Sequence, residues 1–262
     1  MTSLYTLFDF IIRILRYLPY SILKFLNFSL GKNHPRSSRN IMKKELAKLV
    51  QLFSRFAISN TFIDVAPGDK LSTCLKGKKI LEVGCGAGVL TEALAKFGAE
   101  VTGIDSSKEL IEMAQQHSSK NKRLANNLPT YMLTTIEVRN NLLNYDAIVA
   151  SEVIEHVAEK ELFLESCVRA VKPGGKLFFT TPSRTRVAQL IVIFFFESLD
   201  IIPKGTHEYK KFIKPSELKY MLEMNDCLVE SIKGCVYYPF ANYWEWTKHT
   251  LCFFATQAVK ST

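Results

Sequence analysis

The sequence predicts an α/β fold in which helices cover both faces of a mostly parallel central sheet. Two observations carry this prediction. Short apolar runs alternate with helically spaced segments from about residue 78 onward. The chain also has 262 residues, 47% of them hydrophobic, which is enough for one full-sized domain with its own core. We expect this domain to span residues 46–262, after an N-terminal extension at 1–45.

The first half of the expected domain contains two strand–helix units. Each strand is a short apolar run, as in a buried parallel sheet, and the second run ends in an acid. The strands are Lys79–Gly84 and Val101–Asp105, and the helices that follow them are Val89–Phe97 and Lys108–His117.

The second half repeats this order. We expect a strand at Tyr145–Ala150, a helix at Val153–Val171, a turn at Pro173–Gly175 and a strand at Lys176–Thr181. A strand that is followed by a helix and then by another strand favours a parallel pairing with right-handed connections.

The charge of the chain is concentrated at its beginning. Residues 1–44 contain eight Lys or Arg and one acid, so they carry +7 of the net +9 and leave +2 for the rest. Nucleic-acid binding needs basic charge on the folded surface, so we expect no nucleic-acid partner. The six cysteines form no CxxC pair or His–Cys ligand spacing, which indicates reduced and mostly buried thiols.

Residues 4–30 are apolar but are interrupted by charges, so they do not form an uncharged run of about 18 residues that could span a membrane. The order of charged and apolar residues is also wrong for a secretory signal. Basic residues in an apolar helical pattern suit a mitochondrial presequence or a helix in the membrane interface. An ordinary helix packed on the domain is the alternative. A loop is expected at 31–39 and a helix at 41–58.

A glycine motif follows the first expected strand. It reads Glu82-Val83-Gly84-Cys85-Gly86-Ala87-Gly88, and small residues here let the backbone turn tightly and approach a ligand at the start of the next helix. Asp105, at the end of the next strand, is placed to accept hydrogen bonds from ribose hydroxyls. The spacing differs from the GxGxxG of dinucleotide-binding proteins, which disfavours a nicotinamide dehydrogenase. Structural glycines in an ordinary strand–helix turn are the alternative.

This motif resembles that of the class I S-adenosylmethionine-dependent methyltransferases, whose fold is Rossmann-like. Three further segments resemble the ubiquinone biosynthesis O-methyltransferase family more specifically: Ala150–Val157, Lys172–Gly175 and Pro203–Pro215. The resemblance extends from about Leu75 to Ala258, and the segment around His207 is its most specific part.

The resemblance implies a site for S-adenosylmethionine and a site for a divalent metal, usually Mg²⁺. It implies cofactor contacts at Gly84, Gly86, Asp105, Ser106 and Ser151, and metal ligands at Glu152, Glu155 and His156. The implied reaction transfers a methyl group to a catechol-type hydroxyl of a polyprenylated ubiquinone precursor, either a dihydroxy-polyprenylbenzoate or a demethylubiquinol.

The acids and the histidine also suggest a metal site by their spacing. On a helix, positions 152, 155 and 156 share one face, just past the carboxyl end of a strand. Two carboxylates and an imidazole can hold Mg²⁺, Zn²⁺ or Mn²⁺. A solvated start of a helix is the alternative. We expect His156 to be a ligand at the catalytic centre, with a role as general base as the second possibility.

A second apolar run, Val187–Ile202, is flanked by cations and is too short to span a bilayer. It fits a helix lying on an anionic membrane surface, where a polyprenyl substrate is lodged. A buried core or dimer helix is the alternative. With the family resemblance, we expect a peripheral protein on the matrix side of the mitochondrial inner membrane, associated with a ubiquinone biosynthetic complex.

One departure from the family pattern supports a second hypothesis. Family members carry an arginine that helps to bind the carboxylate of the cofactor, but Ile58–Thr73 contains no arginine. The chain is also shortened between Glu137 and Tyr145. The second hypothesis is therefore a divergent, non-catalytic and membrane-associated subunit of a ubiquinone biosynthetic complex.

Overall fold

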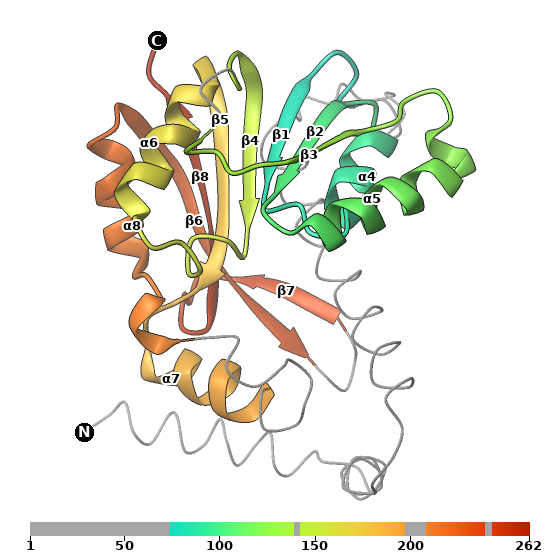
Figure 1. Cartoon of the computed structure of the whole chain (residues 1–262). Helices are drawn as coiled ribbons and strands as arrows, with labels where there is room; N and C mark the ends of the chain where they lie inside the picture. The colour runs from blue at the N-terminus through green and yellow to red at the C-terminus, as the bar shows by residue number, and fades with distance from the viewer. Residues whose placement is uncertain (1–73, 139–141, 197–207, 239–242) are drawn as a thin grey trace, which may run out of the picture. The chain divides into compact units, whose positions relative to one another are not determined.

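The computed structural model describes residues 74–138, 142–196, 208–238 and 243–262 (Figure 1). The expected N-terminal extension, its boundary at residue 45, the helix at 41–58 and the segment without arginine lie outside these residues. So do residues 197–202 of the second apolar run, and His207.

Eight strands of the described residues form one sheet, in the order β3-β2-β1-β4-β5-β8-β6-β7. The first five are parallel to one another, whereas β8 pairs antiparallel with β5 and with β6, and β7 pairs antiparallel with β6. The strands are β1 (Lys79–Val83), β2 (Glu100–Asp105), β3 (Thr130–Leu133), β4 (Tyr145–Ser151), β5 (Val171–Pro182), β6 (Cys227–Tyr238), β7 (Tyr243–Thr247) and β8 (Phe253–Lys260). The expectation of a mostly parallel sheet is confirmed.

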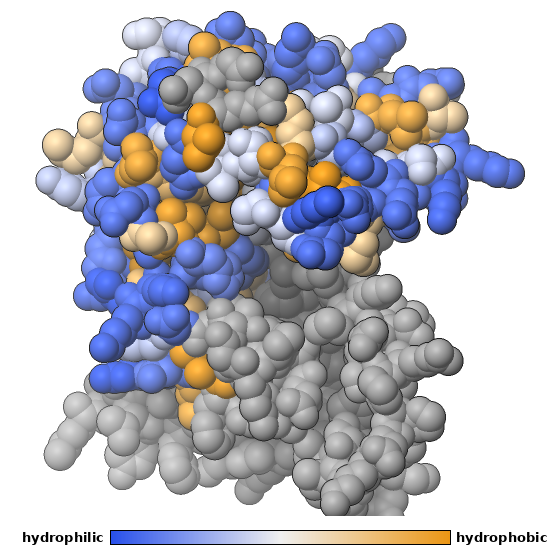
Figure 2. All heavy atoms as spheres, in the orientation of Figure 1, coloured by the Kyte–Doolittle hydropathy of each residue, from blue (hydrophilic) through white to orange (hydrophobic). Residues whose placement is uncertain are grey.

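Helices cover both faces of this sheet because successive residues of each buried strand point to opposite sides. Ile80 packs with Leu90 and Leu94 of α4 (Val89–Lys96), whereas Leu81 belongs to the cluster that contains Phe163 of α6 (Lys160–Ala170) and Leu218 of α8 (Pro215–Glu223). Helix α5 (Lys108–Lys120) contacts β2 and β3. Hydrophilic side chains predominate on the outer surfaces of these helices in Figure 2.

The four predicted strands and the first two predicted helices are present, with ends that differ by at most three residues except at β5, which begins five residues before the predicted Lys176. The sequence pattern did not predict β3, α8 or the antiparallel strands β6, β7 and β8. Short 3₁₀ turns lie at Lys122–Leu124 and Tyr209–Lys211.

The predicted helix at Val153–Val171 is wrong in its first part. Helix α6 begins only at Lys160, and residues 154–156 form a turn. Ile154 in the turn and Phe163 in the helix are both buried, so apolar core residues continue from one into the other without marking the boundary. Glu152 adopts a left-handed conformation, with φ of 56°, so the chain cannot pass from β4 directly into a helix.

The predicted turn at Pro173–Gly175 lies inside strand β5 instead of before it. Tyr145 pairs with Val171 and Ala147 pairs with Lys176, so residues 172–175 form an irregularity in the pairing with β4. Gly174 has φ of 70°, which glycine adopts without steric cost. The glycines therefore mark a bulge within one long strand.

The second apolar run begins as two short helical segments, α7 (Arg186–Ala188) and the π-helix η3 (Gln189–Phe196). Ala188 and Val192 are buried against Phe212, so part of this run belongs to the core of the domain. Leu190, in contrast, is 50% exposed. Across the part of the chain that the structure describes, no helix combines the length and the apolar character needed to span a membrane.

Candidate functional site

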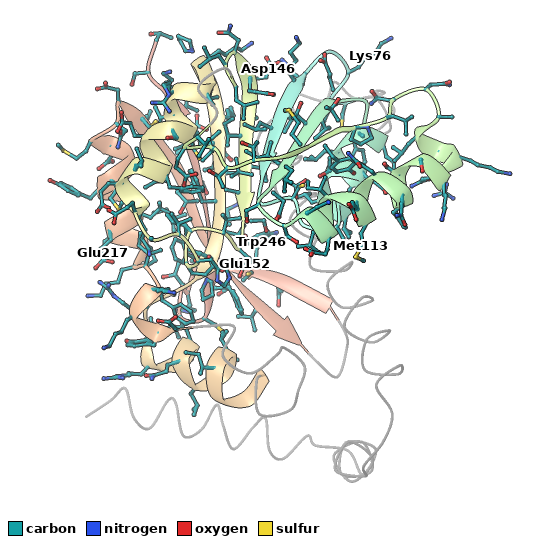
Figure 3. All side chains as sticks on the ribbon, in the orientation of Figure 1. Lys76, Met113, Asp146, Glu152, Glu217 and Trp246 are labelled. Atoms are coloured by element: carbon teal, nitrogen blue, oxygen red, sulfur yellow. The ribbon has the colours of Figure 1, made fainter. Side chains whose placement is uncertain are left out.

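The carboxyl ends of β1 and β4 meet at the point where the strand order reverses. Strand β1 lies between β2 and β4, so the chain builds outward in one direction through β2 and β3, and in the other through β4 and β5. Ligands of open parallel sheets bind at such a point. Figure 3 shows Glu152 at this carboxyl edge, at the opposite end of the sheet from Asp146 and Lys76.

The glycine motif forms the turn between β1 and α4. Gly84 and Gly88 have φ of 71° and 79°. A Cβ atom on Gly84 would lie 2.4 Å from Cγ2 of Val153, and one on Gly88 would lie 2.4 Å from the hydroxyl of Tyr131. These two glycines are therefore required by packing within the protein, not only by the approach of a ligand.

Gly86 differs from the other two glycines. It has φ of 52°, and apart from Gly86 and its two neighbours in the chain, no heavy atom of the described residues lies within 4 Å of the position of an added Cβ. Its N–H donates to Oδ2 of Asp105 at 2.9 Å, and the N–H of Ser107 donates to Oδ1 of Asp105 at 2.8 Å. Each carboxylate oxygen keeps a further lone pair, so Asp105 is held in place and can still accept hydrogen bonds from a diol.

Ser106 and Ser151, the two serines of the expected cofactor site, lie in different environments. Ser106 is exposed directly after β2. Ser151 is the last residue of β4, and because Val83 pairs with Ala150, Ser151 lies beside the start of the glycine turn. Gly84, Gly86, Asp105, Ser106 and Ser151 are thus all placed at the carboxyl edge of the sheet.

The turn after β4 brings two acids together. The N–H of Glu152 donates to the carbonyl of Thr180 at 2.9 Å, and its side chain accepts from the hydroxyl of Thr180, also at 2.9 Å. Glu155 is only 2% exposed and accepts from the hydroxyl of Thr181 at 2.9 Å. Left-handed residues other than glycine are uncommon, and strain of this kind concentrates at functional sites.

The two acids perturb one another. Burial, and secondarily the neighbouring Glu155 carboxylate, raise the pKa of Glu152 well above its usual range. Burial raises the pKa of Glu155 to about 7. The second oxygen of Glu155, Oε1, is buried and receives no hydrogen bond from any donor in the described part of the chain. A shared proton or a bound cation would relieve the repulsion between the two carboxylates.

His156 lies next to this pair. Its Nε2 is 3.9 Å from Oε1 of Glu155, and its side chain is 46% exposed. Within the residues that the structure covers, no three His, Cys, Asp or Glu side chains are already grouped as a metal site. The two acids meet through a turn in the chain, not through the shared helical face that the spacing suggested.

A second pair of acids lies behind the glycine turn. Glu82, on β1, accepts a hydrogen bond from the hydroxyl of Thr91. Glu92, on α4, contacts Nδ1 of His117 and accepts from the side-chain amide of Asn121 at 2.7 Å. Both acids are almost fully buried, and burial raises the pKa of Glu82 to about 8. These partners link α4 to β1 and to the end of α5.

The sequence analysis did not identify the two threonines that donate hydrogen bonds to Glu152 and Glu155. Thr180 and Thr181 end an apolar stretch of β5, so they lie at the same edge as Glu152 and Glu155. Two consecutive hydroxyl residues at the carboxyl end of a buried strand are the signal that could have identified them.

The chain matches known families in sequence. A family model described as a methyltransferase domain matches residues 81–179. The mitochondrial ubiquinone biosynthesis O-methyltransferase of Rattus norvegicus is 42% identical over 211 residues, which are 80% of this chain and 60% of the relative. The ubiquinone biosynthesis O-methyltransferase of Coxiella burnetii (strain RSA 493 / Nine Mile phase I) is 41% identical over 170 residues, 64% of this chain and 71% of the relative. The chain spans less than two thirds of the length of the rat protein.

Solved structures share the fold at low identity. Magnesium protoporphyrin IX methyltransferase from Synechocystis PCC 6803, solved with bound SAH, superposes with a TM-score of 0.61 at 19% identity and covers 97% of this chain and 100% of its own. The plantazolicin methyltransferase, also solved with SAH, gives a TM-score of 0.61 at 18% identity, over 87% and 90% of the two chains. The expected Rossmann-like methyltransferase fold is therefore confirmed, and with the sequence matches the chain belongs to the ubiquinone biosynthesis O-methyltransferase family.

Proposed function

We propose that this protein transfers a methyl group from S-adenosylmethionine to a catechol-type hydroxyl of a polyprenylated ubiquinone precursor. The observation that supports it best is that two sets of residues lie close together at one edge of the sheet. The set formed by Gly86, Asp105 and Ser151 fits the methyl donor, and the set formed by Glu152 and Glu155 fits the group that activates the acceptor. Membership of the family supports the same reaction.

The residues present fit S-adenosylmethionine. Asp105 is fixed by two backbone N–H groups and keeps lone pairs for the ribose hydroxyls, as expected of the acid at the end of the second strand. Gly86 faces open space beside it, so a ligand can approach the backbone closely. When bound, S-adenosylmethionine supplies an electrophilic methyl group on its sulfonium.

The acid pair fits a divalent cation, for which Mg²⁺ is our proposal. Glu152 and Glu155 place two carboxylates together, and a buried oxygen of Glu155 lacks a hydrogen-bond donor in the described part of the chain. His156, beside Glu155, is proposed as the third ligand. Oxygen ligands suit magnesium, although the imidazole would suit manganese or zinc equally well. The cation would supply positive charge that lowers the pKa of a catechol hydroxyl.

The protein's own part in the reaction is mainly to position the reactants. Asp105 and Ser151 orient the donor from one side of the edge, while the turn at Glu152–His156 orients the acceptor from the other. If His156 is not a ligand, its Nε2 can accept the proton that leaves the hydroxyl, because the ring is half exposed next to the acids.

We further propose that the protein works at an anionic membrane surface on the matrix side of the mitochondrial inner membrane, within a ubiquinone biosynthetic complex. The rat and human relatives are named as mitochondrial ubiquinone biosynthesis O-methyltransferases, which supports the compartment. The exposed Leu190, in a run that follows Arg184 and Arg186, supports contact with lipid. A polyprenyl chain would remain in the bilayer while its ring reaches the site.

A methyl-transfer assay tests this function against the alternative of a non-catalytic subunit. The protein is incubated with S-adenosylmethionine, Mg²⁺ and a prenylated dihydroxybenzoate in detergent, and mass spectrometry detects the methylated product. We expect turnover in the wild type, little in Glu152→Gln, and wild-type turnover in Glu165→Gln, which removes an exposed acid on α6. Binding of the donor without turnover of any catechol substrate would favour the non-catalytic subunit.

A further inference from the structure

Hydroxyl groups connect the end of β4 to the acid turn. The hydroxyl of Thr180, on β5, donates to Oε1 of Glu152 at 2.9 Å. The hydroxyl oxygen of Thr180 also lies 2.8 Å from the hydroxyl oxygen of Ser151. Thr180 therefore contacts both a residue of the proposed donor site and a residue of the proposed metal site.

The direction of these hydrogen bonds follows from counting hydrogens. A threonine hydroxyl has one hydrogen and two lone pairs. As a carboxylate, the form in which it would hold a cation, Glu152 only accepts, so Thr180 uses its hydrogen toward Glu152 and the contact with Ser151 requires the hydrogen of Ser151. The order of donation is then Ser151 to Thr180 to Glu152, and the hydroxyl of Ser151 retains only its lone pairs for any other partner.

We propose that Thr180 is a positioning residue that turns the hydroxyl of Ser151 into an obligate acceptor for the methyl donor. This inference rests on the proposed function. S-adenosylmethionine is cationic at its sulfonium and at its ammonium group, so an oxygen that presents lone pairs is favourable and one that presents a hydrogen is not. Thr180 acts through Ser151 and does not itself touch the donor.

A neighbouring threonine provides the matched control. Thr256, on β8, is fully buried, and its hydroxyl has no hydrogen-bond partner in the described part of the chain. It lies on the strand next to β5, where it pairs with Phe179. Replacing Thr256 with Val removes a buried hydroxyl from the same sheet without removing a hydrogen bond.

The test is a calorimetric titration of S-adenosylmethionine into five variants and the wild type. The variants are Thr180→Val, Thr180→Ser, Ser151→Ala, the double variant Ser151→Ala/Thr180→Val, and Thr256→Val. We expect Thr180→Val to weaken binding about tenfold. Thr180→Ser restores the hydroxyl and should stay within about twofold of the wild type, as should Thr256→Val. In the Ser151→Ala background, Thr180→Val should have no further effect, because residues that act through one another are not additive.

The outcomes separate this inference from the proposed function. If the wild type does not bind S-adenosylmethionine, both are wrong. If the wild type binds, two results would overturn only the role of Thr180. One is that Thr180→Val binds S-adenosylmethionine as tightly as the wild type. The other is that Thr180→Val weakens binding by the same factor in the wild-type and Ser151→Ala backgrounds. Thermal unfolding of each variant identifies loss of structure, and Thr180→Ser keeps the test decisive if Thr180→Val does not fold.

Discussion

Two pairs of acids, all of them buried except the half-buried Glu152, lie near the site, and they differ in how their oxygens are satisfied. Glu82 and Glu92, behind the glycine turn, accept hydrogen bonds from Thr91 and Asn121, and Glu92 also contacts His117. Glu152 and Glu155 accept from two threonines, but an oxygen of Glu155 receives no hydrogen bond in the described part of the chain.

The backbone conformation also differs between the two pairs of acids. Glu82 lies in a regular strand, whereas Glu152 adopts a left-handed conformation. Burial raises the pKa of Glu82 and of Glu155, so a raised pKa alone does not distinguish a structural acid from a functional one. The unsatisfied oxygen and the strained backbone are the two features that favour the proposed functional role of Glu152 and Glu155.

The first prediction concerns the packing of the glycine turn, which lies between the two pairs. Gly84→Ala would place a Cβ 2.4 Å from Val153 at a positive φ, and Gly86→Ala would place one in open space. We expect Gly84→Ala to lower the free energy of unfolding by about 3–4 kcal/mol, and Gly86→Ala by only about 1–2 kcal/mol, the cost of the left-handed conformation. Denaturant unfolding measures both. Equal losses would mean that Val153 moves aside easily, and partial rescue of Gly84→Ala by Val153→Ala would confirm the contact.

The second prediction concerns the pH dependence of stability. The pKa of Glu82 is raised from 4.5 to about 8, so the folded protein binds this proton more tightly than the unfolded chain does. Unfolding releases the proton between these two values, and the free energy of unfolding therefore falls as the pH rises through this window. Relative to Glu82→Gln, the wild type should lose roughly 3–5 kcal/mol between pH 5 and pH 9.

Glu100→Gln is the control for this experiment, since it removes an exposed acid from the neighbouring strand β2. Parallel pH profiles for the wild type and Glu82→Gln would show that the carboxyl group of Glu82 remains ionised in the folded protein.

The third prediction separates the two pairs directly. Mg²⁺ or Mn²⁺ at ten to a hundred times its dissociation constant should stabilise the wild type by about 1–3 kcal/mol, measured as a rise in the unfolding temperature. Glu155→Gln should lose this response, because it removes a ligand, and Glu82→Gln should keep it. A response that survives in Glu155→Gln would place the cation elsewhere.

The sequence predicted the regular half of the site better than the strained half. Strand β1, the glycine turn and Asp105 follow one another within a standard strand–helix–strand unit, and their apolar pattern and small residues are local signals. The turn at Glu152 has no such signal. Ile154 and Phe163 are both core residues, but Ile154 lies in the turn and Phe163 lies in helix α6, so burial alone did not show where the helix begins.

The antiparallel end of the sheet was not predicted for a related reason. Strand β8 pairs with β5 across more than 70 residues of sequence, and β6 pairs with β8 in turn. Only tertiary packing determines such pairings. The hydrogen bonds of Thr180 and Thr181 likewise join residues that are 26 or more positions apart, so local pattern could not reveal them.

The smallest expected effect concerns the membrane surface. Leu190 is 50% exposed in the run that also contains the buried Val192. We expect Leu190→Ser to weaken binding to vesicles of anionic phospholipid by about 1 kcal/mol, with wild-type stability. Leu228→Ser is the matched control, because Leu228 is 64% exposed on β6. Equal vesicle binding by both variants would assign this run to the core of the domain alone.

Calorimetric titration with S-adenosylmethionine tests the central claim most directly. The claim is that the carboxyl edge, with Asp105 held by Gly86 and Ser107, binds the methyl donor. We expect saturable binding by the wild type and a loss of about 1–3 kcal/mol in Asp105→Ala, the cost of removing hydrogen bonds to a charged group. No binding by the wild type, or equal affinity in Asp105→Ala, would contradict the claim.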